Sequence, residues 1–175
     1  MSRNTDDDRR TVLKLAGLTA GGVAGVAGLG GIGAADEGDE SEEDGLVTVE
    51  GGETVAGTVE RIEAAIEEEP PELITTFDHA ANAESVREEL RETTLILFGT
   101  PEVGTPIMRE NQAAGIDLPQ KLLVWCDEEG QVQITYNDPE WNLVERHGVS
   151  RSEEIEAMSE ALANFAAAGA GEGAE

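Results

Sequence analysis

An acidic run without an apolar side chain, DEGDESEED at residues 36–44, separates a glycine-rich N-terminal part from the rest of the chain. Such a run cannot bury enough apolar surface to offset the entropy lost on folding. The chain ends in a Gly/Ala/Glu tail at residues 169–175. We therefore expect a disordered linker at residues 36–45 and a disordered tail. The roughly 125 residues between them, 46–168, are enough for one domain with one hydrophobic core.

The N-terminal part carries a localisation signal in its residue order. Paired arginines, Arg9 and Arg10, precede a weakly apolar run at residues 15–32. This order resembles a twin-arginine export signal, although Val12 stands where that pattern prefers phenylalanine. The resemblance predicts that residues 1–35 direct the folded protein out of the cell, to an extracellular or cell-surface position.

A membrane anchor is the alternative for the same segment, because roughly 20 apolar residues are enough to span a bilayer. Eight glycines at residues 17–33 argue against a stable membrane helix. Whether the segment is cleaved or retained stays open at this point. Contact with a membrane is expected only through a retained segment.

The composition is strongly acidic, with 38 Asp and Glu against 11 Lys and Arg and a formal net charge of -27. Self-repulsion on this scale is costly in dilute buffer and tolerable in concentrated salt, so the composition indicates a salt-adapted, halophilic surface. Nucleic acids and anionic membrane surfaces need clustered Lys and Arg, and we exclude both as partners. The acidic runs lack the ligand spacing of an EF-hand, which argues against a calcium sink.

Hydrophobic periodicity beyond the linker alternates between the strand period and the helix period. Strands are predicted at residues 46–50, 73–77, 95–98, 122–125 and 132–136, the last two joined by a DEEG hairpin. The continuous apolar run at 95–98 predicts a central strand that is covered on both faces. We expect an α+β fold: a single two-layer domain whose helices pack on one face of a mixed, largely antiparallel sheet.

Cap residues predict where the helices begin. The predicted starts are Thr54 for a helix to residue 68, Ser85 with Glu88, Thr105 before Pro106, Asp138 before Pro139, and Ser150 with Glu153. Gly115 and Gly148 are predicted to end the third and fourth of these helices. The last helix places Ile155, Met158, Leu162 and Phe165 on one face.

Four motifs, FDHAANA, LFGTPEVGT, IDLPQKLLVW and YNDPEWNLVERHG, stand in the order and spacing of the family catalogued as domain of unknown function 302. The chain resembles that family over residues 49–165. The resemblance implies a compact α+β domain that often forms dimers, so we expect a homodimer, and it brings no established activity. Thr100 replaces the asparagine common in the FGNP turn, and Cys126 replaces an acid, so any role of those two family residues does not carry over.

The candidates for catalysis are Asp78, His79 and Tyr136, with His79 as general base and Asp78 or Tyr136 assisting. Neighbours in an extended segment point to opposite faces, so Asp78 and His79 can pair only if the chain turns between them. For Asp78 the favoured alternative is a helix cap or turn acceptor where the strand meets the helix, and for His79 it is a structural role. Small alanines beside His79 leave space for a ligand.

A metal site is the second hypothesis for the histidines. His79 and His147, with Asp78 or Glu145, would supply two imidazoles and a carboxylate if the fold brought them together. The alternative for His147 is a stabilising interaction with the C-terminal end of a helix dipole.

The loop Gly99–Thr100 to Gly104–Thr105 follows a predicted strand and precedes a predicted helix, which is the context of a phosphate-binding loop. No lysine follows Gly104, so nucleotide hydrolysis of the usual kind is excluded. A small anion held by backbone amides and Thr105 remains, beside the simpler reading of a tight turn.

The few aromatic side chains are interpreted first as core residues. Trp125 and Tyr136 are expected to face each other or the core across the hairpin. Trp141, on a short helix, is suited to cover a pocket. Cys126 cannot form a disulfide within the chain, since it is the single cysteine, and is expected to be a small buried hydrophobe. An intermolecular disulfide and a nucleophilic role are the alternatives.

Three functions follow. The first is an exported, non-catalytic accessory module that binds a small ligand or metal near His79. The second is a structural or dimerisation module. The third is an enzyme using His79, which is disfavoured because the chain lacks a serine or cysteine nucleophile motif, a zinc motif and a dinucleotide fingerprint. No particular cofactor is indicated.

Overall fold

The computed structural model describes residues 45–171. The export signal expected at residues 1–35 and the acidic run at 36–44 lie outside this range. Five strands form one sheet in the order β1-β5-β4-β3-β2. Their bounds are Leu46–Glu50 for β1, Glu72–Asp78 for β2, Thr93–Gly99 for β3, Gln120–Cys126 for β4 and Val132–Asn137 for β5. Every pair is antiparallel, so the sheet lacks the parallel part that a mixed sheet would have.

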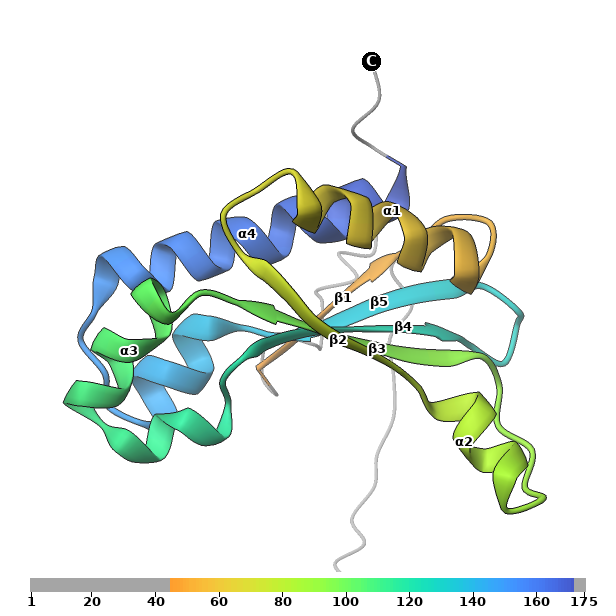
Figure 1. Ribbon diagram of the computed structural model, residues 1–175, viewed down its shortest axis with the longest axis horizontal. Coiled ribbons are helices and arrows are strands. Elements are labelled where there is room, and N and C mark those ends of the chain that lie inside the picture. Colours follow the sequence, from red (N-terminus) through yellow and green to blue (C-terminus); the bar gives the residue numbers. More distant parts are fainter. Residues whose placement is uncertain (1–44, 172–175) are drawn as a thin grey trace, which may run out of the picture. The chain divides into compact units, whose positions relative to one another are not determined.

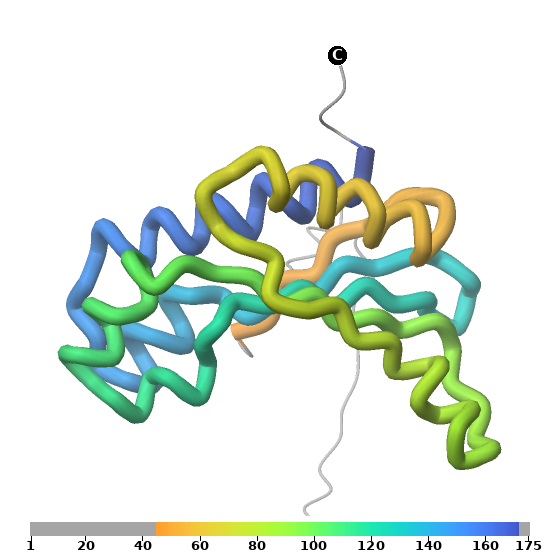
Figure 2. The backbone as a smooth tube through the Cα atoms, in the orientation of Figure 1, coloured from red at the N-terminus to blue at the C-terminus, as the bar shows by residue number. Residues whose placement is uncertain are grey.

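Two long helices, α1 (Val55–Glu67) and α4 (Ser152–Ala170), cover one face of this sheet (Figure 1). They come from opposite ends of the domain sequence and run side by side (Figure 2). Shorter helices flank the sheet: α2 (His79–Ser85), α3 (Pro101–Glu110), the 3-10 helix η2 (Gln112–Ile116) and the π-helix η3 (Glu140–Arg146). The expected two-layer α+β fold is confirmed. Among residues 45–171, no helix has the length and apolar character needed to cross a membrane.

The main core lies between the sheet and the two long helices. It is built by alternate strand residues and by helix residues one turn apart, as the hydrophobic periods require. Its buried members are Val55, Ile62, Ile66, Ile96, Phe98, Leu122, Val124, Val132, Ile134, Leu162, Phe165 and Ala166. The rings of Phe98 and Phe165 meet edge to face with centroids 5.1 Å apart, and this contact packs β3 against α4.

Helix α2 is capped by Asp78, the earlier of the two caps considered from the sequence, and not by Ser85. The carboxylate of Asp78 accepts a hydrogen bond from Ala81 N at 2.9 Å, so the helix starts directly after β2. Ser85 ends this helix, and its hydroxyl donates to the Asn82 carbonyl at 2.6 Å. The predicted cap of Ser85 with Glu88 is therefore wrong. Arg87, with a positive φ of 65°, turns the chain out of the helical path.

Helix α3 also begins earlier than predicted, because its cap is Thr100 and not Thr105. The Thr100 hydroxyl accepts a hydrogen bond from Val103 N at 3.3 Å, and Pro101 is the first helical residue. Thr105 and Pro106 lie inside the helix instead of starting it. Two Thr-Pro pairs compete here, and the one that follows β3 directly prevails because its proline has the φ of a first helical residue.

Replacing Thr100 with alanine is expected to lower the free energy of unfolding by about 1 kcal/mol, because Val103 N loses its acceptor. Thr105→Ala is the matched control. It lies inside α3, where alanine is the best helix former, so its expected effect is within about 0.5 kcal/mol. Urea unfolding in molar salt measures both. The opposite order of effects would move the start of the helix to Thr105.

The start and end of α4 differ from the predictions in a similar way. The predicted cap of Ser150 with Glu153 does not form, since α4 begins at Ser152 without a side-chain cap. Ser150 donates instead from its amide and its hydroxyl to the Glu110 carboxylate, at 2.8 and 2.7 Å, and these bonds lower the pKa of Glu110. At its other end α4 runs through Gly169, two residues into the expected tail. A Cβ on Gly169 would lie 2.8 Å from Ile62, so glycine permits the close approach of α1 and α4.

Candidate functional site: the open face of the sheet

The sheet face opposite α1 and α4 is the main candidate surface. Among residues 45–171 no layer of helices covers it (Figure 1). We call this surface the open face. Its side chains alternate with those of the main core and are Thr48, Thr75, Phe77, Leu95, Leu97, Lys121, Leu123, Trp125, Gln133 and Thr135.

A row of facing residues crosses the open face. Phe77 stands opposite Leu95, Leu95 opposite Leu123, and Leu123 opposite Thr135. The first three are apolar, and no member of the row is acidic. Phe77 keeps 43% of its surface exposed. The expected covering of β3 on both faces is thus wrong: Ile96 and Phe98 are buried under the helices, whereas the open-face leucines of β3 are only partly buried by their neighbours.

Trp125 and Tyr136 lie on opposite faces of the hairpin. The register places Trp125 opposite Gln133, so Trp125 belongs to the open face, where its Nε1 donates to the Thr135 hydroxyl at 2.9 Å. Tyr136 packs against the main core, and burial raises the pKa of its hydroxyl. The expectation that they face each other or the core therefore holds for Tyr136 alone. Trp125 faces neither, because the two positions differ by one step of the strand alternation.

Trp141 lies against the backbone at the start of β1. Gly45 has a φ of +67°, and a Cβ there would be 2.3 Å from the indole Cδ2. The indole of Trp141 therefore packs directly on the backbone of Gly45, where a Cβ would clash with it.

His79 stands at one end of the open face, at the start of α2. Its ring meets the ring of Phe77 edge to face, with centroids 4.9 Å apart. Asp78 uses its carboxylate to cap α2, which confirms that interpretation of the residue. Tyr136 is on the covered side of the sheet. The three candidates for catalysis are therefore not brought together.

His147 lies at the other end of the sheet. Its Nε2 is 2.6 Å from the Asp117 carboxylate, and Asp117 precedes β4. His79 follows the end of β2 that pairs with Thr94, whereas Asp117 is near the Phe98 end of β3. About 13 Å of strand lies between those ends at 3.3 Å per residue. The predicted two-histidine metal site does not form, and residues 45–171 contain no cluster of three metal-ligating side chains.

Two amides of the loop predicted to hold an anion, those of Val103 and Gly104, donate within the loop itself. Val103 N donates to the Thr100 hydroxyl at 3.3 Å, and Gly104 N donates to the Thr100 carbonyl at 3.1 Å. Gly99 ends β3, while Gly104 and Thr105 are inside α3. Glu102 adds a negative charge to the first turn, which disfavours an anion there.

The family model for "Domain of unknown function DUF302" matches residues 47–166. The chain belongs to the DUF302 family. A crystal structure of an uncharacterised conserved DUF302 protein from Bacillus stearothermophilus superposes with a TM-score of 0.63 at 20% sequence identity, covering 71% of this chain and 98% of that one. This likeness confirms the fold.

Curated relatives of this DUF302 protein include two that are named "Fluoride-specific ion channel FluC 1". The protein from Brucella suis is 40% identical over 113 residues, which are 65% of this chain and 44% of that protein. The protein from Brucella abortus is also 40% identical over 113 residues, which are 42% of its length. The chain thus spans less than half the length of the curated relatives it matches.

The two departures from the DUF302 pattern have local explanations. Thr100 caps α3, a role in which asparagine is also favoured, so threonine replaces the usual residue without loss of the cap. Cys126 is partly buried against the main core and is a free thiol. Its carbonyl accepts from Arg91 Nε at 2.9 Å, a bond that needs no particular side chain at this position.

Sequence reasoning missed two members of this DUF302 site. Asp117 was not considered as the partner of His147, because 30 residues separate them and no spacing rule joins them. The rarity of Lys121 was interpreted only as a sign of the acidic composition, and not as a pointer to a binding residue. The available signal was its rarity, since it is the single lysine beyond residue 35.

Proposed function

We propose that this protein is an exported, salt-adapted, non-catalytic accessory module of the DUF302 family, and that the open face of its sheet binds the ligand or partner. The observation that carries the proposal is the apolar, acid-free row from Phe77 to Leu123 on an uncovered face. Exposed apolar patches of this kind mark binding surfaces. The contrast with a chain that carries 38 acidic residues strengthens the argument.

Export is supported by the order of residues 1–35. Paired arginines before a weakly apolar run favour the twin-arginine route, which carries folded proteins, and the net charge of -27 favours a salty medium outside the cell. An accessory role is supported by the curated relatives, which include a similar region within longer proteins named as fluoride channels. Fluoride therefore belongs among the small anions to be tested.

A thermal-shift panel in molar salt tests the proposal on the full chain. The panel contains neutral and anionic apolar ligands, fluoride and divalent metals. A ligand at a hundred times its Kd adds about 2.7 kcal/mol, which moves the melting midpoint of a domain of this size by several degrees. The midpoint shift is expected with apolar ligands and is expected to be lost in Leu123→Gln.

The control is Ala64→Gln, which adds the same side chain to the exposed surface of α1, on the covered side of the sheet. It is expected to keep the full shift. Equal shifts in the wild type and both variants would place the binding surface elsewhere. A shift with fluoride or a metal alone, unchanged in Leu123→Gln, would favour a polar site away from the open face.

Homodimerisation through the open face is the second candidate. Two chains of net charge -27 repel each other least where acids are absent, and the row centred on Leu95 and Leu123 meets this condition. Sedimentation equilibrium is expected to give a dimer for the wild type and a monomer for Leu123→Gln if this candidate is correct.

An enzyme with His79 as general base has less support. Asp78 caps α2, and Tyr136 lies on the opposite face, so neither is placed to assist the imidazole. His79→Ala is expected to leave ligand-induced shifts on the open face largely in place.

A further inference from the structure

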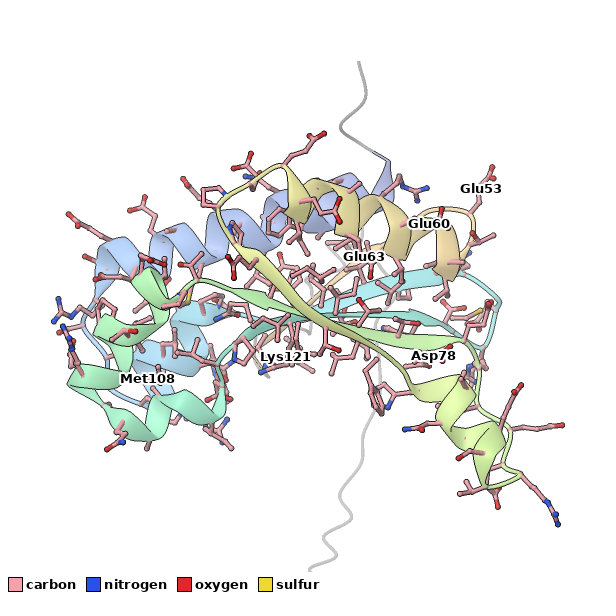
Figure 3. The ribbon with its side chains drawn as sticks, viewed as in Figure 1. Glu53, Glu60, Glu63, Asp78, Met108 and Lys121 are labelled. Carbon is pink, nitrogen blue, oxygen red and sulfur yellow. The ribbon has the colours of Figure 1, made fainter. Side chains whose placement is uncertain are left out.

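Lys121 is the one cationic side chain among the open-face residues named above. It is the single lysine beyond residue 35 and lies on β4, on the side of the sheet away from α1 and α4 (Figure 3). Its Nζ donates to the Asp117 carbonyl at 3.0 Å. Within residues 45–171 no carboxylate forms a salt bridge with it, because the Asp117 carboxylate is engaged by His147 at 2.6 Å and Arg146 at 3.5 Å.

This arrangement is unusual for a lysine in so acidic a chain. The side chain is half-buried, and burial lowers the pKa of its ammonium, an effect that the nearby charge of Asp117 opposes. An ammonium has three donors, and only one is used in the described bonds. A partly desolvated cation with unused donors can bind an anion, which accepts those hydrogen bonds.

Asp117 lies on one side of Lys121, whereas the neighbouring open-face residues on β3 and β4 are apolar. Leu97 stands opposite it on β3, and Leu123 is the next open-face residue on β4. Trp125 follows at the far end of the same strand. Four residues of strand separate Lys121 from Trp125, which corresponds to about 13 Å. A positive charge thus stands at one end of a row of apolar side chains on β4, Leu123 and Trp125, which we call the apolar track.

We propose that the open face binds a single-chain carboxylic acid, with its carboxylate on Lys121 and its apolar chain along Leu123 toward Trp125. The proposal deepens the proposed function, on which it rests, by naming the ligand class. One ammonium matches one carboxylate, and the distance of about 13 Å along β4 from Lys121 to Trp125 matches the length of one extended alkyl chain of about ten carbons. A membrane of anionic lipids is a poorer match, because its many negative charges are repelled by a chain of net charge -27, whereas a fatty acid brings a single negative charge to Lys121.

Calorimetric titration of the full chain in molar NaCl tests this, with decanoate and the neutral 1-decanol as probes. Decanoate is expected to bind the wild type at least about tenfold more tightly than decanol, as a charge-assisted hydrogen bond implies. Lys121→Met keeps the apolar stem and is expected to lose about tenfold in decanoate affinity. Lys121→Arg keeps the charge and is expected to stay within about threefold.

Arg109→Met is the matched control, because it removes one positive charge from an exposed position of α3 that makes no salt bridge in the described chain. It is expected to leave decanoate affinity unchanged. Lys121→Met should melt no lower than the wild type, which separates lost binding from lost folding. Equal affinity for decanoate in the wild type and Lys121→Met overturns the proposal.

The outcomes also separate this proposal from the proposed function. Equal binding of decanol and decanoate, lost in Leu123→Gln, would retain the open face as a binding surface and overturn the carboxylate anchor. Binding of neither probe would overturn the ligand class. If Arg109→Met lost as much decanoate affinity as Lys121→Met, the loss would be explained by the change in net charge alone. That result would likewise overturn the role of Lys121.

Discussion

Replacing Phe98 with alanine is expected to lower the free energy of unfolding by about 3–5 kcal/mol. Only 2% of Phe98 is exposed, and its ring is held between the sheet and α4 by edge-to-face contact with Phe165 at 5.1 Å. The substitution removes the apolar contacts and leaves a cavity that close-packed neighbours such as Ile96 cannot fill. A loss of this size approaches the total stability of an ordinary domain.

Phe77→Ala is the matched control for this experiment. Phe77 has the same side chain and lies on the neighbouring strand β2, but on the open face with 43% of its surface exposed. Its removal is expected to cost about 1–2 kcal/mol, because only part of the side chain is buried and only its contacts with Leu95 and His79 are lost. Urea unfolding of both variants in molar salt gives the two values. Equal losses would mean that the open face is buried as deeply as the core, and would contradict its role as a free binding surface.

Much of the fold could be predicted because its signals are local. The alternation of Val132, Ile134 and Tyr136 predicts one buried face of β5, and the structure buries Val132 and Ile134 beneath the helices, with Tyr136 partly buried against the same core. The predicted bounds of β1 at residues 46–50 agree with the structure. The start of a helix was harder to predict where two residues could cap it. Asp78 and Ser85 could both cap α2, and Thr100 and Thr105 could both cap α3. In both cases the cap nearer to the strand prevails, since the sheet already fixes its backbone: Asp78 is the last residue of β2, and Thr100 directly follows β3.

The candidate site was less accessible to sequence reasoning, because it depends on which strands pair. Alternation shows that Leu95 and Leu97 point to one face, but only the strand order shows that this face carries no helix among the described residues. The register also decides that Trp125 joins the open face and Tyr136 the core. Lys121 becomes a candidate only when the salt bridges of Asp117 are known, since they leave its ammonium without a carboxylate.

Replacing Asp117 with alanine is expected to destabilise the domain by about 2–3 kcal/mol. The side chains of Asp117 and His147 are only 13% and 10% exposed, and 2.6 Å separates the carboxylate from Nε2. The contact ties the end of η3 to the turn before β4, and Asn111 holds the same end through a bond to the His147 carbonyl at 2.8 Å. Removing the carboxylate leaves a nearly buried imidazole without its partner. Urea unfolding measures the loss.

A double-mutant cycle separates the pair from its surroundings. If the contact is the main role of His147, the double variant Asp117→Ala/His147→Ala should be more stable than the sum of the two single losses implies, by about 1–3 kcal/mol. Glu128→Ala is the control, because its ion pair with Arg91 is 3.9 Å long with side chains 82% and 53% exposed, and such pairs contribute less than about 1 kcal/mol. Additive losses at Asp117 and His147 would show that the imidazole is not committed to the carboxylate. His147 would then again be a candidate for ligand binding. Strong coupling would instead show that its role is structural, as the partner of Asp117, the residue whose carbonyl accepts from Lys121.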